Sequence, residues 1–432
     1  MNPNMDVLSN KAIYINKGMI QEIGVADDIR KKYNNPSFII ELDEHDIVIP
    51  GLINTHTHVC MSAFGDLADD RELNDWLFNY IFPLEGALVT KDFCTTAVTL
   101  GMAEMLQGGT TTFVDGYFFQ DEMATLVKEV GMRGVLCEGV IDFPQPDFET
   151  PNETFAYIET FLQKWQGNNF ITPCIIPHAP YTTSSWIYKR SVDLVKKYGG
   201  ILSTHLAESP TENQTIMERY GMSSTEYLHA NDFLTPNTIL AHAVWLSDSD
   251  RKLVSDSGAF IAHNPTSNLK LASGVFDYEA SKEAGIPITI GTDGPASNND
   301  VDMIEEVRLA SFLAKGSSLS PTVASAKEVL YSSTIGGARA IGRDDELGSI
   351  EVGKKADIAI IKRANRMKLY PTYDPYSAIV YSSNGDNVFA TVIDGKILYY
   401  DGKLVTIDEA ELLEKVALIN EQVMAKLEEI HS

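Results

Sequence analysis

The chain has 432 residues, of which 34 are Lys or Arg and 60 are Asp or Glu, so its formal net charge is −26. Hydrophobic residues make up 44% of the chain, which is typical of a globular protein and not of a disordered one. The acidic balance, without any cluster of Lys and Arg, argues against nucleic-acid binding. Because no run of about 18 apolar residues occurs, we expect no membrane span.

The first residues and the cysteines both favour a cytoplasmic location. Residues 1–6 lack the basic region and apolar core of a signal peptide. The chain has four cysteines, which stand far apart and form no C-x-x-C pair: Cys60, Cys94, Cys137 and Cys174. We expect them to be reduced and buried, which excludes zinc-finger chemistry. The sequence leaves the oligomeric state open, so a homo-oligomer remains compatible with it.

Strand patterns occur at both ends of the chain. We predict a strand in each of five stretches, where apolar residues stand at alternating or successive positions: residues 11–15, 19–24, 356–361, 389–393 and 397–400. We predict a small β-sandwich domain built from both termini, with residues 1–48 as its N-terminal part. Residues 346–432 form its C-terminal part and end in a helix.

The middle of the chain alternates helical patterns with short apolar runs. The helical spacing is clearest over residues 90–107, with Thr90 as the N-cap and Gly108-Gly109 as the stop. Eight apolar runs are typical of buried parallel strands: residues 53–58, 112–115, 134–142, 171–176, 201–206, 238–242, 259–263 and 286–292. Eight strand–helix units over roughly 250 residues fit a (β/α)8 TIM-type barrel, which we place at residues 49–345.

The ends of these strands carry the chemistry-bearing residues, as a barrel of this kind requires. Six of the nine histidines lie at or just after a predicted strand end: His56, His58, His178, His205, His242 and His263. Residues two apart on a strand point to the same side, so His56 and His58 can reach one ion. We assign His56, His58, His205 and Asp293 as ligands of one Zn²⁺, with Fe²⁺ or Mn²⁺ as alternatives.

Bound Zn²⁺ lowers the pKa of its water to about 7, which supplies hydroxide at neutral pH. Asp293 and His242 are the candidates that orient this water and accept its proton. Glu208, three residues after His205, is a candidate general acid and base. The alternatives are a carboxylate favoured by a helix N-terminus for Glu208 and a core histidine for His242.

Three further polar residues near the strand ends have a mainly structural interpretation. His263 is expected to be a structural histidine, and Asp115 a hydrogen-bond partner at the end of its strand. Cys60 continues the same-face pattern of His56 and His58 and could be a soft ligand, but we assign it to packing. The strand-four region, residues 176–180, has no Lys that could bridge two metals, so we expect a single ion.

These residues resemble the motifs of the amidohydrolase superfamily. The matching stretches are residues 50–58 (PGLINTHTH), 205–208 (HLAE), 291–294 (GTDG) and, for its composite β domain, 347–357 (LGSIEVGKKAD). Within the superfamily the chain is most similar to the 5′-methylthioadenosine/S-adenosylhomocysteine deaminases. The stretches that carry this similarity are residues 65–70, 76–77, 83–85, 177–181, 268–274 and 293–299.

The resemblance implies a mononuclear zinc site and hydrolytic removal of the adenine 6-amino group. Its implied substrates are adenosine-type nucleosides (5′-methylthioadenosine, adenosine or S-adenosylhomocysteine), which give the inosine analogue and ammonia. It implies substrate contacts from Glu85, His178 and Glu208, with Glu85 on the ribose hydroxyls. Trp76 would line the pocket for the 5′ substituent, and Ser297 belongs to the same substrate-binding set.

The sequence departs from the family after the third strand. Some members hold the homocysteine carboxylate there with arginines, whereas residues 137–149 of this chain contain no Arg and are acidic. An anionic tail would find no clamp in this region. We therefore expect a neutral 5′ group to be preferred over S-adenosylhomocysteine, unless an Arg from elsewhere or from a partner chain supplies the clamp.

Two other functions compete with nucleoside deamination. A related aminohydrolase or chlorohydrolase acting on a triazine, guanine or 8-oxoguanine would have the same metal site, and only the pair Glu85 and His178 favours a nucleoside. A non-catalytic barrel that serves as a scaffold is the remote alternative, because such proteins typically lose metal ligands and none is missing here.

Overall fold

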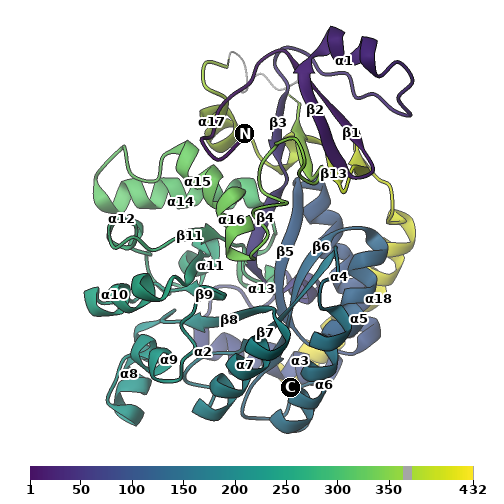
Figure 1. The fold of residues 1–432 in the computed structure, drawn as a ribbon. Helices are drawn as coiled ribbons and strands as arrows, with labels where there is room; N and C mark the ends of the chain where they lie inside the picture. The colour runs from purple at the N-terminus through teal and green to yellow at the C-terminus, as the bar shows by residue number, and fades with distance from the viewer. Residues whose placement is uncertain (363–371, 432) are drawn as a thin grey trace.

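Eight parallel strands form the centre of the molecule and follow one another in chain order around a barrel (Figure 1). They are β4 (Leu52–Thr57), β5 (Thr110–Tyr117), β6 (Arg133–Val140), β7 (Ile171–Pro177), β8 (Ile201–Leu206), β9 (Thr238–His242), β10 (Phe260–His263) and β11 (Ile288–Ile290). The computed structural model describes residues 1–362 and 372–431. It confirms the predicted (β/α)8 barrel.

Side chains join the first strand of the barrel to the last. The Thr55 hydroxyl donates to the Ile290 carbonyl at 2.9 Å, and the Asn54 amide donates to the Thr292 hydroxyl at 2.8 Å. Beyond the strands, the Asp293 N–H donates to the His56 carbonyl at 3.0 Å. Polar residues within the buried strand β4 are thus explained by closure of the barrel, and this closure sets His56 beside Asp293.

Helices cover the outside of the barrel and return the chain from one strand to the next. They are α4 (Lys91–Gln107), α5 (Gln120–Val130), α6 (Pro151–Trp165), α7 (Ser185–Tyr198), α8 (Pro210–Tyr220), α9 (Ser224–Ala230), α10 (Asp248–Ser257), α11 (Pro265–Lys270), α12 (Tyr278–Glu283), α13 (Pro295–Asn298), α14 (Met303–Ser318), α15 (Ala326–Ser332) and α16 (Ile335–Ala340). The predicted cap of α4 is present, since the Thr90 hydroxyl accepts the Phe93 N–H.

Two antiparallel sheets stand at one end of the barrel. The hairpin of β1 (Lys11–Asn16) and β2 (Met19–Val25) forms one of them and is followed by α1 (Ala26–Lys32). The other has five strands in the order β15 (Lys403–Leu404), β14 (Lys396–Tyr400), β13 (Val388–Ile393), β12 (Ile358–Ile361) and β3 (Ile47–Pro50). Strand β3 comes before the barrel and β12 after it, so both ends of the chain contribute to this sheet.

A buried ion pair fastens the small sheet to the barrel. Arg133, the first residue of β6, is 1% exposed and donates to both carboxylate oxygens of Asp357, at 2.6 and 3.0 Å. Arg133 also donates to the Asn169 carbonyl at 2.7 Å. Because Asp357 directly precedes β12, this pair sets the small sheet against the N-terminal ends of the barrel strands.

The chain after β4 forms a cap of short helical turns over the barrel mouth. It comprises a 3₁₀ turn (Val59–Phe64), α2 (Leu73–Trp76), a π-helical turn (Leu77–Ile81) and α3 (Phe82–Leu88). The C-terminal helix α18 (Glu409–His431) packs against α4, α3 and the 3₁₀ turn, and its residues Leu412, Ile419 and Val423 belong to the same buried hydrophobic cluster as this region. The short helix α17 (Pro375–Ser377) precedes β13. None of the helices in the described part of the chain has the length and apolar character needed to cross a membrane.

Candidate metal centre and substrate pocket

Histidines and one carboxylate converge at the C-terminal mouth of the barrel. His56, His205, His242 and Asp293 each offer one ligand atom, and these four atoms lie within 4.8 Å of one another. His58, which directly follows β4, lies beside them: its Nε2 is 3.3 Å from Asp293 Oδ1 and 3.1 Å from His205 Nε2. The structure therefore brings together the four residues predicted as ligands and places His242 next to them.

The distances between these atoms fit one divalent cation. An ion bound tetrahedrally at about 2.0–2.1 Å keeps neighbouring ligand atoms about 3.3 Å apart. Asp293 Oδ1 lies 3.3 Å from Nε2 of both His56 and His58. His56 Nε2 is buried and has no hydrogen-bond partner among the described residues, which is costly unless a further group binds it. This donor set is that of a site for a single divalent metal.

Backbone carbonyls orient two of the imidazoles. His58 Nδ1 lies 2.5 Å from the Gly116 carbonyl oxygen, and His205 Nδ1 lies 2.7 Å from the His178 carbonyl oxygen. An acceptor at Nδ1 keeps the hydrogen on that nitrogen and leaves the lone pair of Nε2 free. Both Nε2 atoms therefore face the centre.

The surroundings of these groups shift their ionisation. Burial alone would lower the pKa of His58, but Asp293 and the Gly116 carbonyl outweigh it and raise that pKa to about 9, so this imidazole must lose a proton when a metal ion binds. Burial lowers the pKa of His56 to about 4 and lowers the pKa of His205 well below its usual range. Both imidazoles are thus neutral at pH 7 and retain a lone pair. Burial alone would raise the pKa of Asp293, but the neighbouring imidazoles of His56 and His58 outweigh it and hold that pKa well below the usual range. Asp293 is the anionic member of the set.

Two serines hold Asp293 in place. Ser267 Oγ donates to Asp293 Oδ2 at 2.6 Å, and Ser297 Oγ donates to the same oxygen at 3.0 Å. Oδ1 remains directed at the histidines. Sequence reasoning missed Ser267, and the only signal was a small polar residue in the first turn after a strand end. Ser297, predicted as a substrate contact, lines the cavity and also bonds Asp293.

Glu208 and His242 stand side by side at the edge of the centre. Glu208 Oε2 lies 3.9 Å from His242 Nε2, and Glu208 Oε1 accepts a hydrogen bond from Ser273 at 3.1 Å. The Asn268 side-chain oxygen faces His242 Nδ1 at 2.8 Å, which leaves His242 Nε2 free toward the centre. Burial raises the pKa of Glu208 above its usual range. A carboxyl group with a raised pKa is suited to donate and accept protons near neutral pH.

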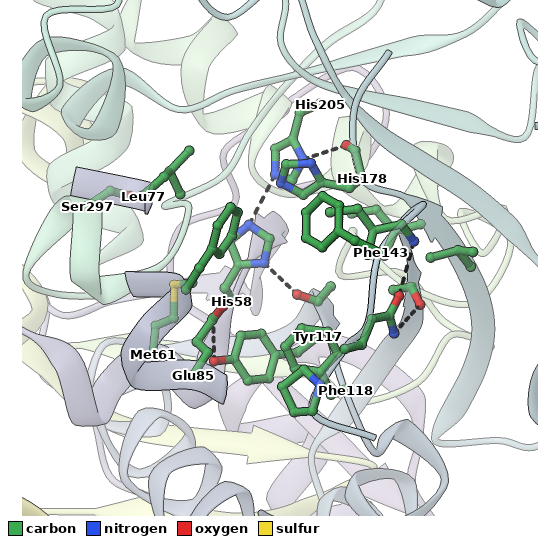
Figure 2. A pocket seen from close by; sticks show the side chains of 18 of the residues that line it. His58, Met61, Leu77, Glu85, Tyr117, Phe118, Phe143, His178, His205 and Ser297 are labelled. Atoms are coloured by element: carbon green, nitrogen blue, oxygen red, sulfur yellow. Dashed lines mark hydrogen bonds between the residues drawn. The ribbon is translucent and has the colours of Figure 1, made fainter. Parts of the chain in front are cut away.

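A cavity of about 450 Å³ opens beside these groups (Figure 2). All residues predicted to contact the substrate line it: Trp76, Glu85, His178, Glu208 and Ser297. Trp76 and Glu85 come from the cap, whereas the other three follow strands of the barrel. The structure therefore brings residues from distant parts of the chain to one cavity.

Tyr117, which sequence reasoning did not single out, contacts one of these residues. Figure 2 shows its hydroxyl bonded to Glu85, at 2.7 Å from Oε1. Burial raises the pKa of Glu85 to about 7, and the bond from Tyr117 opposes this rise. On the other side of the cavity His178 Nδ1 is paired with the Thr182 hydroxyl at 2.7 Å, and burial lowers the pKa of His178 to about 4.

The loop after β6 forms one wall of the cavity. Phe143, Gln145 and Glu149 line it, and Gln145 holds the loop by donating to the Gly139 carbonyl at 3.1 Å. Within the described parts of the chain, neither Lys nor Arg is among the lining residues. The described cavity wall, like the sequence of this loop, thus offers no cationic clamp.

Three other candidates lie outside the centre. The Cys60 thiol is buried against that of Cys94, with 3.1 Å between the sulfur atoms. Asp115 accepts the Val59 N–H at 2.7 Å and so fixes the chain that follows His58. The ring of His263 packs on Phe276, with 4.7 Å between the ring centres.

Comparison with known proteins agrees with this geometry. The sequence profile of the amidohydrolase family matches residues 47–398. The chain is 36% identical to 5-methylthioadenosine/S-adenosylhomocysteine deaminase 1 of Syntrophus aciditrophicus, over 99% of this chain and 96% of that protein. It is also 36% identical to the 5′-deoxyadenosine deaminase of Methanosarcina barkeri, over the same shares of the two chains.

A solved structure of a deaminase is also similar to this chain. The crystal structure of an adenosine deaminase from Xanthomonas campestris with bound zinc matches with a TM-score of 0.94 and 32% identity, and the match covers 98% of this chain and 95% of that one. The profile match, these relatives and the shared fold show that the chain belongs to the amidohydrolase family and is a hydrolase of carbon–nitrogen bonds, a deaminase.

Proposed function

We propose that the protein removes the 6-amino group of adenosine-type nucleosides by hydrolysis, with one Zn²⁺ held by His56, His58, His205 and Asp293. The observation that carries the proposal is a buried metal-ligand set at one end of a cavity with Glu208 beside it. The names of the relatives support it, since they are deaminases of 5-methylthioadenosine, S-adenosylhomocysteine and 5′-deoxyadenosine.

Each residue at the centre has its own role in the proposed reaction. When bound, the metal ion acidifies a water molecule, which can then act as a nucleophile at neutral pH. Asp293 and His242 orient this water and accept its proton. Glu208 passes a proton to N1 of the purine and then to the departing amine. A C6–O bond forms, the C6–N bond breaks, and one water is consumed to give the inosine analogue and ammonia.

The cavity wall supports the nucleoside as substrate. Glu85 is the acceptor for the ribose hydroxyls, and His178 and Ser297 contact the base side of the substrate. Trp76 lines the part of the cavity that receives the 5′ substituent. With Phe143 on the facing loop and no cation in the described wall, we assign a neutral 5′ group, as in 5′-methylthioadenosine, 5′-deoxyadenosine or adenosine. The carboxylate of S-adenosylhomocysteine would lack a partner there.

The test measures ammonia release from 5′-methylthioadenosine, adenosine, S-adenosylhomocysteine and guanine by protein of known metal content. We expect turnover of the neutral nucleosides, its loss after dialysis against a chelator, and its return with Zn²⁺. Glu208→Gln should keep the metal and lose turnover by about 10²–10⁴-fold.

Four results would contradict the proposal or a part of it. One is full activity of metal-free protein, which would remove the metal from the reaction. Another is near-normal turnover in Glu208→Gln, which would remove Glu208 from it. A preference for guanine over every nucleoside would assign the site to another heterocycle, and a tenfold preference for S-adenosylhomocysteine would overturn the assignment of the 5′ group.

A further inference from the structure

Glu212 is a buried carboxylate that does not line the cavity. It is 3% exposed and lies in the first turn of α8. Its two oxygens accept consecutive backbone N–H groups, that of Ala207 at 2.8 Å and that of Glu208 at 3.1 Å. A carboxylate from one helix thus binds the segment that connects β8 to this helix.

This arrangement is unusual within the same chain. A Glu three residues after a Ser or Thr N-cap normally reaches back to the N–H of the capping residue. Glu153 in α6, Glu226 in α9 and Glu328 in α15 all do so. Ser209 and Glu212 have the same spacing, and Ser209 caps α8, but Glu212 bypasses the Ser209 N–H and reaches residues 207 and 208 instead. Helix capping therefore does not explain where this side chain points.

The backbone that Glu212 holds is strained. Strand β8 ends at Leu206, and Ala207 then adopts a φ of +47°, a left-handed conformation that is unfavourable for a non-glycine residue. Successive N–H groups around a left-handed residue form a concave anion-binding site. Without the carboxylate, the buried N–H of Ala207 and the partly buried N–H of Glu208 would lose their acceptor. Glu212 is the group that stabilises this turn.

The turn determines where the Glu208 carboxylate points. Its oxygens lie 3.1 Å from Ser273 Oγ and 3.9 Å from His242 Nε2, at the edge of the cavity. We propose that Glu212 is a positioning residue for the deamination: by binding the N–H groups of Ala207 and Glu208, it fixes the direction in which Glu208 enters the cavity. This inference rests on the proposed role of Glu208 in proton transfer.

The test is Glu212→Gln, which keeps the size of the side chain but replaces one acceptor oxygen with a donor. Assays with 5′-methylthioadenosine at pH 8 keep Glu212 ionised in the parent enzyme, because burial raises its pKa to about 7. We expect kcat to fall about 10- to 100-fold, since small misplacement of a catalytic group has effects of this size. KM should stay within about threefold, and the metal content should stay unchanged.

Glu226→Gln is the matched control, because it changes the corresponding residue of the capping box in α9. It should lower thermal stability without lowering kcat. An unchanged kcat in Glu212→Gln would overturn the inference. So would a parallel loss of kcat, substrate affinity and bound metal, since that pattern marks a merely structural role.

Two further variants keep the result decisive. If Glu212→Gln does not fold, Glu212→Asp is measured, whose shorter side chain cannot reach both N–H groups; a normal kcat in this variant overturns the inference. Glu208→Gln is assayed in parallel. If it is inactive while Glu212→Gln is normal, only the role of Glu212 fails; if Glu208→Gln itself is normal, the proposed function of Glu208 fails with it.

Discussion

The Tyr117 hydroxyl donates a 2.7 Å hydrogen bond to Glu85 Oε1, and both side chains are buried in the cavity wall. Tyr117 is the last residue of β5 and Glu85 lies in α3, so this bond connects the barrel to its cap. Because burial raises the pKa of Glu85 to about 7, the ionisation of this carboxyl group changes within the neutral range.

This relationship predicts a pH dependence of substrate binding. If ionised Glu85 accepts the ribose hydroxyls, kcat/KM should fall as the pH drops below about 7, where Glu85 becomes protonated. Tyr117→Phe removes a donor that favours the ionised form, so the acidic limb should move to higher pH. At pH 7 we expect kcat/KM to fall about tenfold, mainly through KM, which is the effect of one lost hydrogen bond to a charged group. The pH–rate profiles of the two proteins check this, and identical profiles would contradict it.

A second prediction concerns the support of Asp293. Ser267→Ala removes the 2.6 Å bond to Asp293 Oδ2 and leaves only that of Ser297. Loss of a partner that orients a metal ligand typically costs about 10- to 100-fold in metal affinity. We expect a decrease of this size in the zinc affinity of Ser267→Ala, measured by competition titration with a zinc chelator. Ser203→Ala is the control, because Ser203 is also fully buried but its hydroxyl has no hydrogen-bond partner in the part of the chain that the structure describes. Equal affinities in both variants would contradict the role of Ser267.

The cavity wall predicts a gain of function. Glu149 is exposed and lines the cavity in the loop that lacks a cation. Glu149→Arg should raise kcat/KM for S-adenosylhomocysteine about three- to tenfold, the range of an exposed ion pair plus the removal of a repulsive charge. Turnover of 5′-methylthioadenosine should stay the same. Glu149→Gln, which removes the repulsion alone, should give a smaller gain; an equal gain would show that the added cation makes no contact.

The ion pair between the barrel and the small sheet predicts a stability effect. Arg133→Met leaves the Asp357 carboxylate buried without its partner, which should cost about 3–5 kcal/mol of unfolding free energy. Arg190→Met removes an ion pair with Glu159 whose Arg is nearly half exposed, and it should cost less than about 1 kcal/mol. Urea unfolding of the two variants checks the difference. Comparable losses would show that burial does not set the strength of the Arg133 pair.

The sequence was sufficient to predict the barrel and the strand ends that carry the histidines. Strands 201–206 and 238–242 have the predicted bounds. Both are buried along their whole length, and a His stands at the end of one and next to the end of the other. In a (β/α)8 barrel the C-terminal ends of all strands lie at one face, so the sequence also predicts that the ends of these two strands meet there. The sequence could not show that the β1–β2 hairpin forms a sheet separate from β3, since alternation indicates a strand but not its partner.

The supporting residues were beyond sequence reasoning for a different reason. Ser267, Tyr117 and Glu212 are ordinary residue types whose roles depend on contacts between separate loops or helices. Glu212 in particular has the spacing of a helix cap, so the pattern predicts a local bond that the structure does not contain. His242 was singled out from the sequence, but the sequence could not show that its ligand atom lies within 4.8 Å of those of His56, His205 and Asp293.

The pairing of β3 with β12 imposes an order on folding. Ile49 is hydrogen-bonded opposite Ala359, so the whole barrel is translated between the two halves of this ladder. During synthesis β3 leaves the ribosome long before its neighbour exists, and such long-range pairing forms late. We therefore expect the pairing of β3 with β12 to form last. A nascent chain stalled before residue 358 would leave the edge of β3 unpaired and open to chaperones or to other chains.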